Sequence, residues 1–118
     1  PQKYVQTGKS EAMEATLKGI PDNATKILLC HRPYPFEEFA QCNVDLMLSG
    51  HTHGGQVALA NFGNWNVSFA ALISKYIQGY YRSEKNPRSQ MYVSRGIGTV
   101  GVPIRVNCPP EVTKIVLG

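Results

Sequence analysis

The sequence predicts an α/β fold, and three observations support this prediction. Two short apolar runs, at residues 26–30 and 44–48, have the length and composition of buried strands. The segment between them favours a short helix at residues 36–41, so the order strand, helix, strand predicts a βαβ unit with a parallel pair of strands. Each apolar run is followed directly by a histidine motif. Because open α/β sheets bind ligands at the carboxyl ends of their strands, we expect a functional site at this edge.

The composition is that of a globular protein and not of a disordered or fibrous one. Of the 118 residues, 42% are hydrophobic and 17% are charged, which suits a domain with a modest core. The chain begins with Pro1, which indicates a processed, trimmed or partial chain, and we expect residues 1–118 to form a single partial domain. The three cysteines are odd in number and widely spaced, which favours small buried side chains in a reducing compartment over a disulfide framework.

No targeting signal is visible in the sequence. There is no signal peptide, and no apolar run approaches the roughly 20 residues that a membrane-spanning helix needs. We therefore expect a cytoplasmic or membrane-associated protein. An export signal or a membrane anchor, if the protein has one, would lie upstream of Pro1.

Local patterns predict the other elements of the first half. Residues 1–9 are expected to form a loop or the tail of another element. Apolar residues build one helical face over residues 10–17, and Gly19 followed by Pro21 ends this helix. Residues 56–59 are expected to continue as a strand after the second histidine motif.

The second half carries a helical pattern and then three β segments. Between residues 67 and 80, large apolar side chains recur at helical spacing. Such a stripe is typical of core packing, and a lipid-binding face is the alternative. Residues 91–94, 104–106 and 112–117 are expected to be β segments, separated by turns rich in glycine and proline.

All three histidines of the chain lie in the two motifs that follow the apolar runs. His31 follows the first run, and His51 and His53 lie in a glycine-framed segment after the second. Imidazole is a common metal ligand and is largely neutral near pH 7. Residues two apart on an extended chain project to the same side, about 6–7 Å from each other, which suits two neighbouring metal ions. The spacing therefore predicts part of a metal-dependent catalytic site, with His31 as a further ligand.

The two halves of the chain differ in charge. Residues 51–118 hold seven Lys/Arg against two Asp/Glu, a net +5, whereas residues 1–50 hold five against six, a net −1. A diffuse basic surface and a positive field around a phosphate-bearing substrate both explain the excess. Nucleic acid is disfavoured as a partner, because the basic residues form no dense run and no aromatic stacking motif accompanies them. Arg32 is expected either to contact substrate phosphate or to form a salt bridge.

Three groups of residues together form a recognisable pattern. The first two are His31-x-Pro33 and the segment Asp45-Leu46-x-Leu48-Ser49-Gly50-His51-Thr52-His53-Gly54-Gly55-Gln56. The third comprises Tyr92-Val93-Ser94-Arg95-Gly96-Ile97-Gly98, Pro103-Ile104-Arg105 and Pro109-Pro110-Glu111-Val112-Thr113. This pattern resembles the calcineurin-like metallophosphoesterase superfamily. It is similar to the bacterial phosphodiesterase branch that includes UDP-2,3-diacylglucosamine hydrolase-like and cell-wall-associated members, and it covers the chain from about Ala24 onward.

The resemblance implies a fold, an activity and a cofactor. The fold is the C-terminal half of a four-layer α/β/β/α sandwich with a mixed sheet, and the activity is hydrolysis of phosphoester bonds, of the phosphodiesterase or pyrophosphatase type. Two divalent ions would activate water, with His31 and His51 on one ion and His53 on the other; manganese, iron and zinc all suit such ligands.

The expected substrate is a phosphate-containing small molecule or a lipid-linked one, and a membrane surface stays open as a partner. Candidates for substrate binding are Arg32, Gly54, Gly55, Gln56, Arg95 and Arg105. For the last two, salt bridges to the body of the fold are the alternative.

Much of the ligand set of this superfamily is missing from the chain. The motifs Asp-x-His, Gly-Asp-x-x-Asp and Gly-Asn-His-Asp do not occur, and neither Asp22 nor Asp45, the only aspartates, can replace the bridging carboxylate. We therefore assign no catalytic residue to this chain and expect negligible activity and weak metal binding from it alone. The expected partner is the missing N-terminal half of the same domain. A non-catalytic scaffold with the same fold, and a small subunit that completes a site with a partner chain, are the alternative hypotheses.

Overall fold

The computed structural model of the protein describes residues 11–62 and 65–118. The segment 1–9, with its predicted loop or tail, lies outside the described residues, as does Ser10, the expected start of the first helix. The helix α1 (Glu11–Leu17) occupies the rest of the predicted range. It ends before Gly19, whose φ of 78° is the left-handed conformation that commonly follows a helix.

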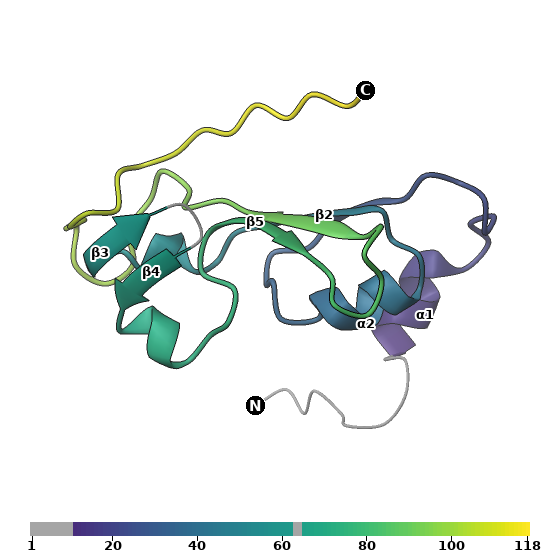
Figure 1. The fold of residues 1–118 in the computed structure, drawn as a ribbon, viewed down its shortest axis with the longest axis horizontal. Coiled ribbons are helices and arrows are strands. Elements are labelled where there is room, and N and C mark those ends of the chain that lie inside the picture. The colour runs from purple at the N-terminus through teal and green to yellow at the C-terminus, as the bar shows by residue number, and fades with distance from the viewer. Residues whose placement is uncertain (1–10, 63–64) are drawn as a thin grey trace.

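A four-stranded mixed sheet forms the centre of the fold (Figure 1). The strands β1 (Ile27–Leu29), β2 (Leu46–Ser49) and β6 (Gln90–Val93) are parallel neighbours in that order, and β5 (Gly79–Arg82) pairs with β6 in the antiparallel direction. The helix α2 (Phe36–Gln41) connects β1 to β2. The predicted α/β class with a mixed sheet is thus confirmed, and so is the βαβ unit with its parallel pair.

One face of the sheet is covered by α1 and α2. The core on this face consists of apolar side chains that are at least nine-tenths buried: Met13, Phe36, Phe39, Val44, Met47, Tyr76, Met91 and Val93. On the opposite face, Ile27 is 45% exposed and Leu29 is 77% exposed. The first apolar run, predicted to be a buried strand, is therefore covered on only one face within the described part of the chain, because the helices pack against that face and nothing described covers the other.

A second, two-stranded sheet lies at one end of the molecule (Figure 1). It is a hairpin of β3 (Ala58–Phe62) and β4 (Trp65–Ser68), paired in the antiparallel direction. The strand expected at residues 56–59 therefore begins two residues later, because Gln56 still belongs to the histidine turn and Val57 forms only an isolated bridge with Val106.

The helical pattern between residues 67 and 80 is not followed by a helix. The segment contains the end of β4, a short 3₁₀ turn at Ala70–Leu72 and the start of β5. Backbone pairing of these strands with β3 and β6 prevails over the side-chain spacing. The prediction that this stripe packs in the core is correct only for Tyr76 and Ile77. Phe69, Leu72 and Ile73 are 78%, 80% and 76% exposed.

The C-terminal segment is extended but largely unpaired within the described residues. The β segment expected at residues 104–106 is reduced to a single bridge between Val106 and Val57, and residues 112–117 form no strand. Neither the four-stranded sheet nor the hairpin includes a strand from this segment, so its backbone has no ladder partner among the described residues. Figure 1 shows this segment on the side of the sheet opposite the helices. The four-layer sandwich stays a prediction.

Two further observations concern the environment of the protein. None of the helices within residues 11–62 and 65–118 is long and apolar enough to cross a membrane. All three cysteines are free thiols; Cys108 is buried, whereas Cys30 and Cys42 are half-buried.

Candidate metal centre

The two histidine motifs meet at the carboxyl edge of the sheet, as predicted. The pairing of β1 with β2 continues past the strands, since Cys30 N–H donates to Leu48 O at 3.0 Å and Gly50 N–H donates to His31 O at 3.1 Å. These bonds bring the two residues that follow the strands side by side. His31 Nε2 and His51 Nδ1 are 3.2 Å apart, and the rings meet edge to face with their centroids 5.0 Å apart.

The histidine pair fits a metal ion. Two imidazole nitrogens that each lie about 2.0–2.1 Å from one tetrahedral ion are about 3.3 Å apart, close to the observed 3.2 Å. Burial lowers the pKa of the His51 imidazole, and electrostatic interaction with the neighbouring His31, Arg32 and His53 side chains lowers it further. A neutral imidazole keeps the lone pair that coordination requires.

The structure brings His31 and His51 together but does not gather a full ligand set. Within residues 11–62 and 65–118, no three His, Cys, Asp or Glu side chains form a group that could hold a metal ion. His53 points elsewhere: its Nδ1 lies 3.2 Å from the carbonyl oxygen of Gly98. Since a carbonyl only accepts, a hydrogen bond here requires the hydrogen on Nδ1, and a neutral His53 ring then has its lone pair on Nε2, the usual arrangement of a metal-binding histidine. The assignment of all three histidines as metal ligands stays a prediction.

The turn that carries His51 and His53 has an unusual backbone. Both residues, and Gln56 after them, have positive φ angles, of 72°, 51° and 51°. Such angles are uncommon outside glycine and gather at functional sites. Gly54 and Gly55 also have positive φ, and a Cβ on Gly54 would lie 2.5 Å from Arg95 Cγ. The glycines therefore permit a tight turn.

The predicted substrate-binding residues of this turn contact other parts of the chain. Gln56 Nε2 donates to the carbonyl oxygens of Val100 and Val102, each at 3.0 Å, and its Oε1 accepts from Val100 N–H at 2.7 Å. The Gln56 side chain thus holds the 100–102 loop beside the site. Gly54 is buried and Gly55 half-buried. Substrate binding by these three residues stays a prediction.

The three candidate arginines have different surroundings. Arg32 is exposed beside His31. Arg95 Nε pairs with Glu111 Oε2 at 2.7 Å, and both side chains are largely buried. Arg105 donates hydrogen bonds to several backbone carbonyls around His53. For Arg95 the structure therefore shows the salt bridge that was the alternative to phosphate binding.

Sequence reasoning missed several residues that shape the site. Tyr34 meets the His51 ring edge to face, with centroids 6.0 Å apart. Thr52 Oγ1 donates to Ile77 O at 2.5 Å and anchors the turn between the two histidines. Cys108 Sγ lies 3.1 Å from His53 O. For Thr52 the position between two histidines was an available signal, whereas nothing local in the sequence indicates that Cys108 reaches the turn.

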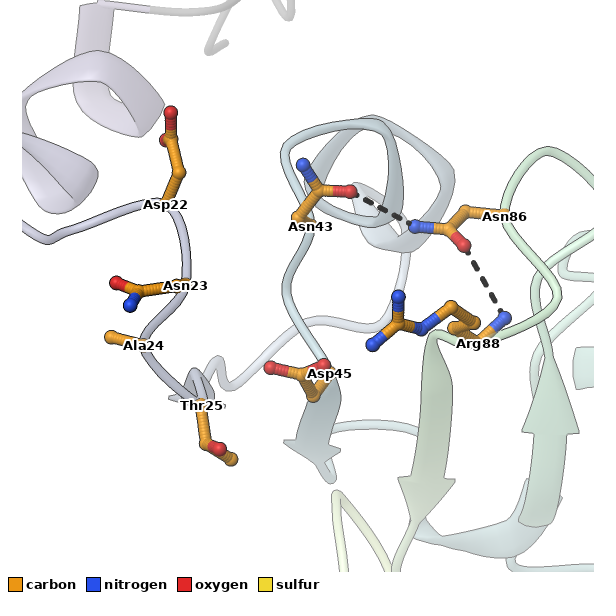
Figure 2. A pocket seen from close by; sticks show the side chains of 8 residues that line it. All are labelled: Asp22, Asn23, Ala24, Thr25, Asn43, Asp45, Asn86 and Arg88. Atoms are coloured by element: carbon orange, nitrogen blue, oxygen red, sulfur yellow. Dashed lines mark hydrogen bonds between the residues drawn. The ribbon is translucent and has the colours of Figure 1, made fainter.

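Cavities occur at both edges of the sheet. At the carboxyl edge, a shallow cavity of about 300 Å³ lies at the ends of β1 and β2. It is lined by Leu29, Cys30, His31, Leu48, Ser49 and Gly50. A second cavity, of about 410 Å³, lies at the opposite edge and is lined by Asp45, Asn86, Arg88 and the loops around them (Figure 2). The second cavity contains no histidine, so we place the candidate site at the carboxyl edge.

Several known proteins are similar to this chain. Metallophosphoesterase YkuE of Bacillus subtilis is 35% identical over 104 residues, which make up 88% of this chain and 35% of that protein. Phosphodiesterase YaeI of Escherichia coli is 35% identical over 96 residues, which make up 80% of this chain and 33% of that protein. A transmembrane protein with metallophosphoesterase domain of Bos taurus is 31% identical over 113 residues, covering 94% of this chain and 24% of that protein.

The similarity is to one part of each of these proteins. The chain spans about a third of the length of YkuE and of YaeI. No family model matches the chain, and no solved structure matches it significantly. The similarity nevertheless covers at least 80% of the chain in each of the three cases, and each name includes a phosphoesterase or phosphodiesterase. Over most of its length, the chain is therefore homologous to part of proteins named as metallophosphoesterases or as a phosphodiesterase.

Proposed function

We propose that this chain supplies part of a two-metal site that hydrolyses phosphoester bonds, of the phosphodiesterase or pyrophosphatase type. The observation that carries the proposal is the approach of His31 Nε2 to His51 Nδ1 at the ends of adjacent parallel strands. The names of the relatives support the reaction class. Two bound divalent ions, of manganese, iron or zinc, would supply an activated water and neutralise charge on the phosphoryl oxygens.

The roles of the residues follow from their positions. His31 and His51 would hold one ion through the nitrogens that face each other, and His53 would hold the other through Nε2. Tyr34 packs against the His51 ring and limits its rotation. Arg32 lies exposed beside the histidine pair, where its charge suits an anionic substrate such as a small phosphodiester or a lipid-linked phosphate.

The remaining ligands would come from the part of the protein that this chain does not span. Carboxylates are needed to bridge two ions, and the only two aspartates lie in or beside the cavity at the opposite edge of the sheet. The sheet face with Ile27 and Leu29 is apolar and uncovered in the described residues, which supports packing of a further layer there. We infer that an N-terminal part of the same domain forms this layer and completes the four-layer sandwich.

The test is a hydrolysis assay with the complete protein that contains this chain. Stripped of metal and resupplied with Mn²⁺, it should hydrolyse bis-p-nitrophenyl phosphate. His51→Ala should lower kcat/KM by more than about 100-fold, since even residues that only orient metal ligands contribute about 10–100-fold. Arg88→Ala, at the opposite edge of the sheet, is the matched control and should retain the activity. Absence of metal-stimulated turnover in the wild-type protein would favour the non-catalytic scaffold and contradict the proposal.

A further inference from the structure

Arg105 lies at the centre of the loops that surround His53. Its guanidinium donates hydrogen bonds to carbonyl oxygens only, apart from a contact of Nη1 with Cys108 Sγ at 3.5 Å. Nη2 reaches the carbonyl oxygens of Gly98 at 2.5 Å, Arg95 at 2.9 Å and Gly96 at 3.1 Å. Nη1 reaches Cys108 O at 3.2 Å and His53 O at 3.3 Å, and Nε reaches Gly98 O at 3.1 Å. All three guanidinium nitrogens thus face the protein backbone.

The Gly98 carbonyl oxygen, which accepts hydrogen bonds from Arg105, also contacts His53. The same oxygen accepts a hydrogen bond from His53 Nδ1 at 3.2 Å. Arg105 therefore fixes the acceptor that selects the His53 tautomer, and through Nη1 it also holds the carbonyl of His53 itself. His53 has a φ of 51°, a conformation that a residue other than glycine keeps only when its surroundings enforce it.

These hydrogen bonds favour a structural role for Arg105 over the phosphate contact that was predicted from the sequence. A guanidinium has five N–H donors, and here six contacts to five backbone carbonyls share them. A lysine at this position would present a single ammonium group, which cannot reach carbonyls spread around a planar fork.

We propose that Arg105 is a positioning residue, which holds the Gly98 carbonyl so that His53 carries its hydrogen on Nδ1 and presents Nε2 to the site. The role of His53 Nε2 as a metal ligand rests on the proposed function. The hydrogen-bond arrangement around His53 does not, because it is formed by the chain without any metal ion.

The first test is NMR of the complete, metal-free protein at about pH 8, where an ordinary imidazole is neutral. Long-range ¹H–¹⁵N spectra, with the His53 signals assigned by their loss in His53→Ala, should show a protonated Nδ1 and an unprotonated Nε2. A protonated Nε2 in the wild-type protein would overturn the proposal. This measurement needs no variant of Arg105, so it decides the question even if such variants do not fold.

The second test is Arg105→Lys, which keeps the charge, with Arg88→Lys as the matched control. Arg105→Lys should populate both His53 tautomers and weaken Mn²⁺ binding by about 10–100-fold, as is typical when the partner of a metal-binding histidine is lost. At saturating Mn²⁺ its kcat should fall while KM for bis-p-nitrophenyl phosphate stays within about twofold. A raised KM with unchanged kcat and unchanged tautomer would instead show that Arg105 contacts substrate. If the wild-type protein hydrolyses nothing, the proposed function fails, but the tautomer still tests the role of Arg105.

Discussion

Gly54 offers a sharp test of how tightly the histidine turn is packed. Its φ is 61°, and a Cβ at this position would lie 2.5 Å from Arg95 Cγ and 2.6 Å from Cys108 Sγ. Two costs therefore add in Gly54→Ala. A side chain in the left-handed region costs about 1–2 kcal/mol, and overpacking costs about 1–3 kcal/mol. We expect Gly54→Ala to lower the free energy of unfolding by about 2–5 kcal/mol.

Gly19 provides the matched control for this substitution. Its φ is 78°, so it also lies in the left-handed region, but a Cβ there would meet nothing within 4 Å. Gly19→Ala should therefore show only the conformational cost of about 1–2 kcal/mol. The difference between the two variants isolates the clash with Arg95 and Cys108.

Urea unfolding of the complete protein, followed by circular dichroism, measures both variants. The midpoint of Gly54→Ala should fall further than that of Gly19→Ala, with the same denaturant dependence. Binding of Mn²⁺ should weaken in Gly54→Ala alone, because Cys108 Sγ contacts the carbonyl oxygen of His53. Equal loss of stability in the two variants would refute the close packing of the turn.

Two further predictions concern the loops around the sheet. Although burial opposes ionisation of Glu37, hydrogen bonds from Ser83 and from the N–H groups of residues 84 and 85 lower its pKa below the ordinary 4.5. The ionised carboxylate therefore stabilises the fold above about pH 4.5, and this contribution is lost as the pH falls through the lowered pKa. Urea unfolding should show a smaller loss of stability on acidification in Glu37→Gln than in the wild type; parallel pH profiles would contradict the shift. Gln56→Ala removes three hydrogen bonds to Val100 and Val102 and should cost about 1–3 kcal/mol. Hydrogen exchange at the Val100 N–H should accelerate, and unchanged protection would show that another contact holds the loop.

The elements around the candidate site could be predicted because their signals are local. Short apolar runs mark β1 and β2, and the intervening segment is long enough for the helix that a parallel connection requires. Once two parallel strands are neighbours, the residues after them must share an edge. The meeting of His31 and His51 follows from this rule.

The segment 67–80 could not be predicted in the same way. Its apolar residues have helical spacing, but its backbone pairs with strands that are distant in the sequence, as Tyr80 does with Tyr92. Side-chain spacing carries no information about such a partner. The same local pattern is therefore compatible with a helix and with a segment that joins the end of one strand to the start of the next.

The sequence by itself determined the residue types of the site, the order of the elements that deliver them and the absence of the superfamily's aspartate motifs. Only the tertiary structure decided which of those residues face one another. Insertion of β6 between β2 and β5 places the 95–98 loop beside the histidine turn, and Arg105 then reaches His53 across 52 positions of the chain. Contacts at that separation depend on strand order and on the path of loops, and neither is encoded in the spacing of neighbouring side chains.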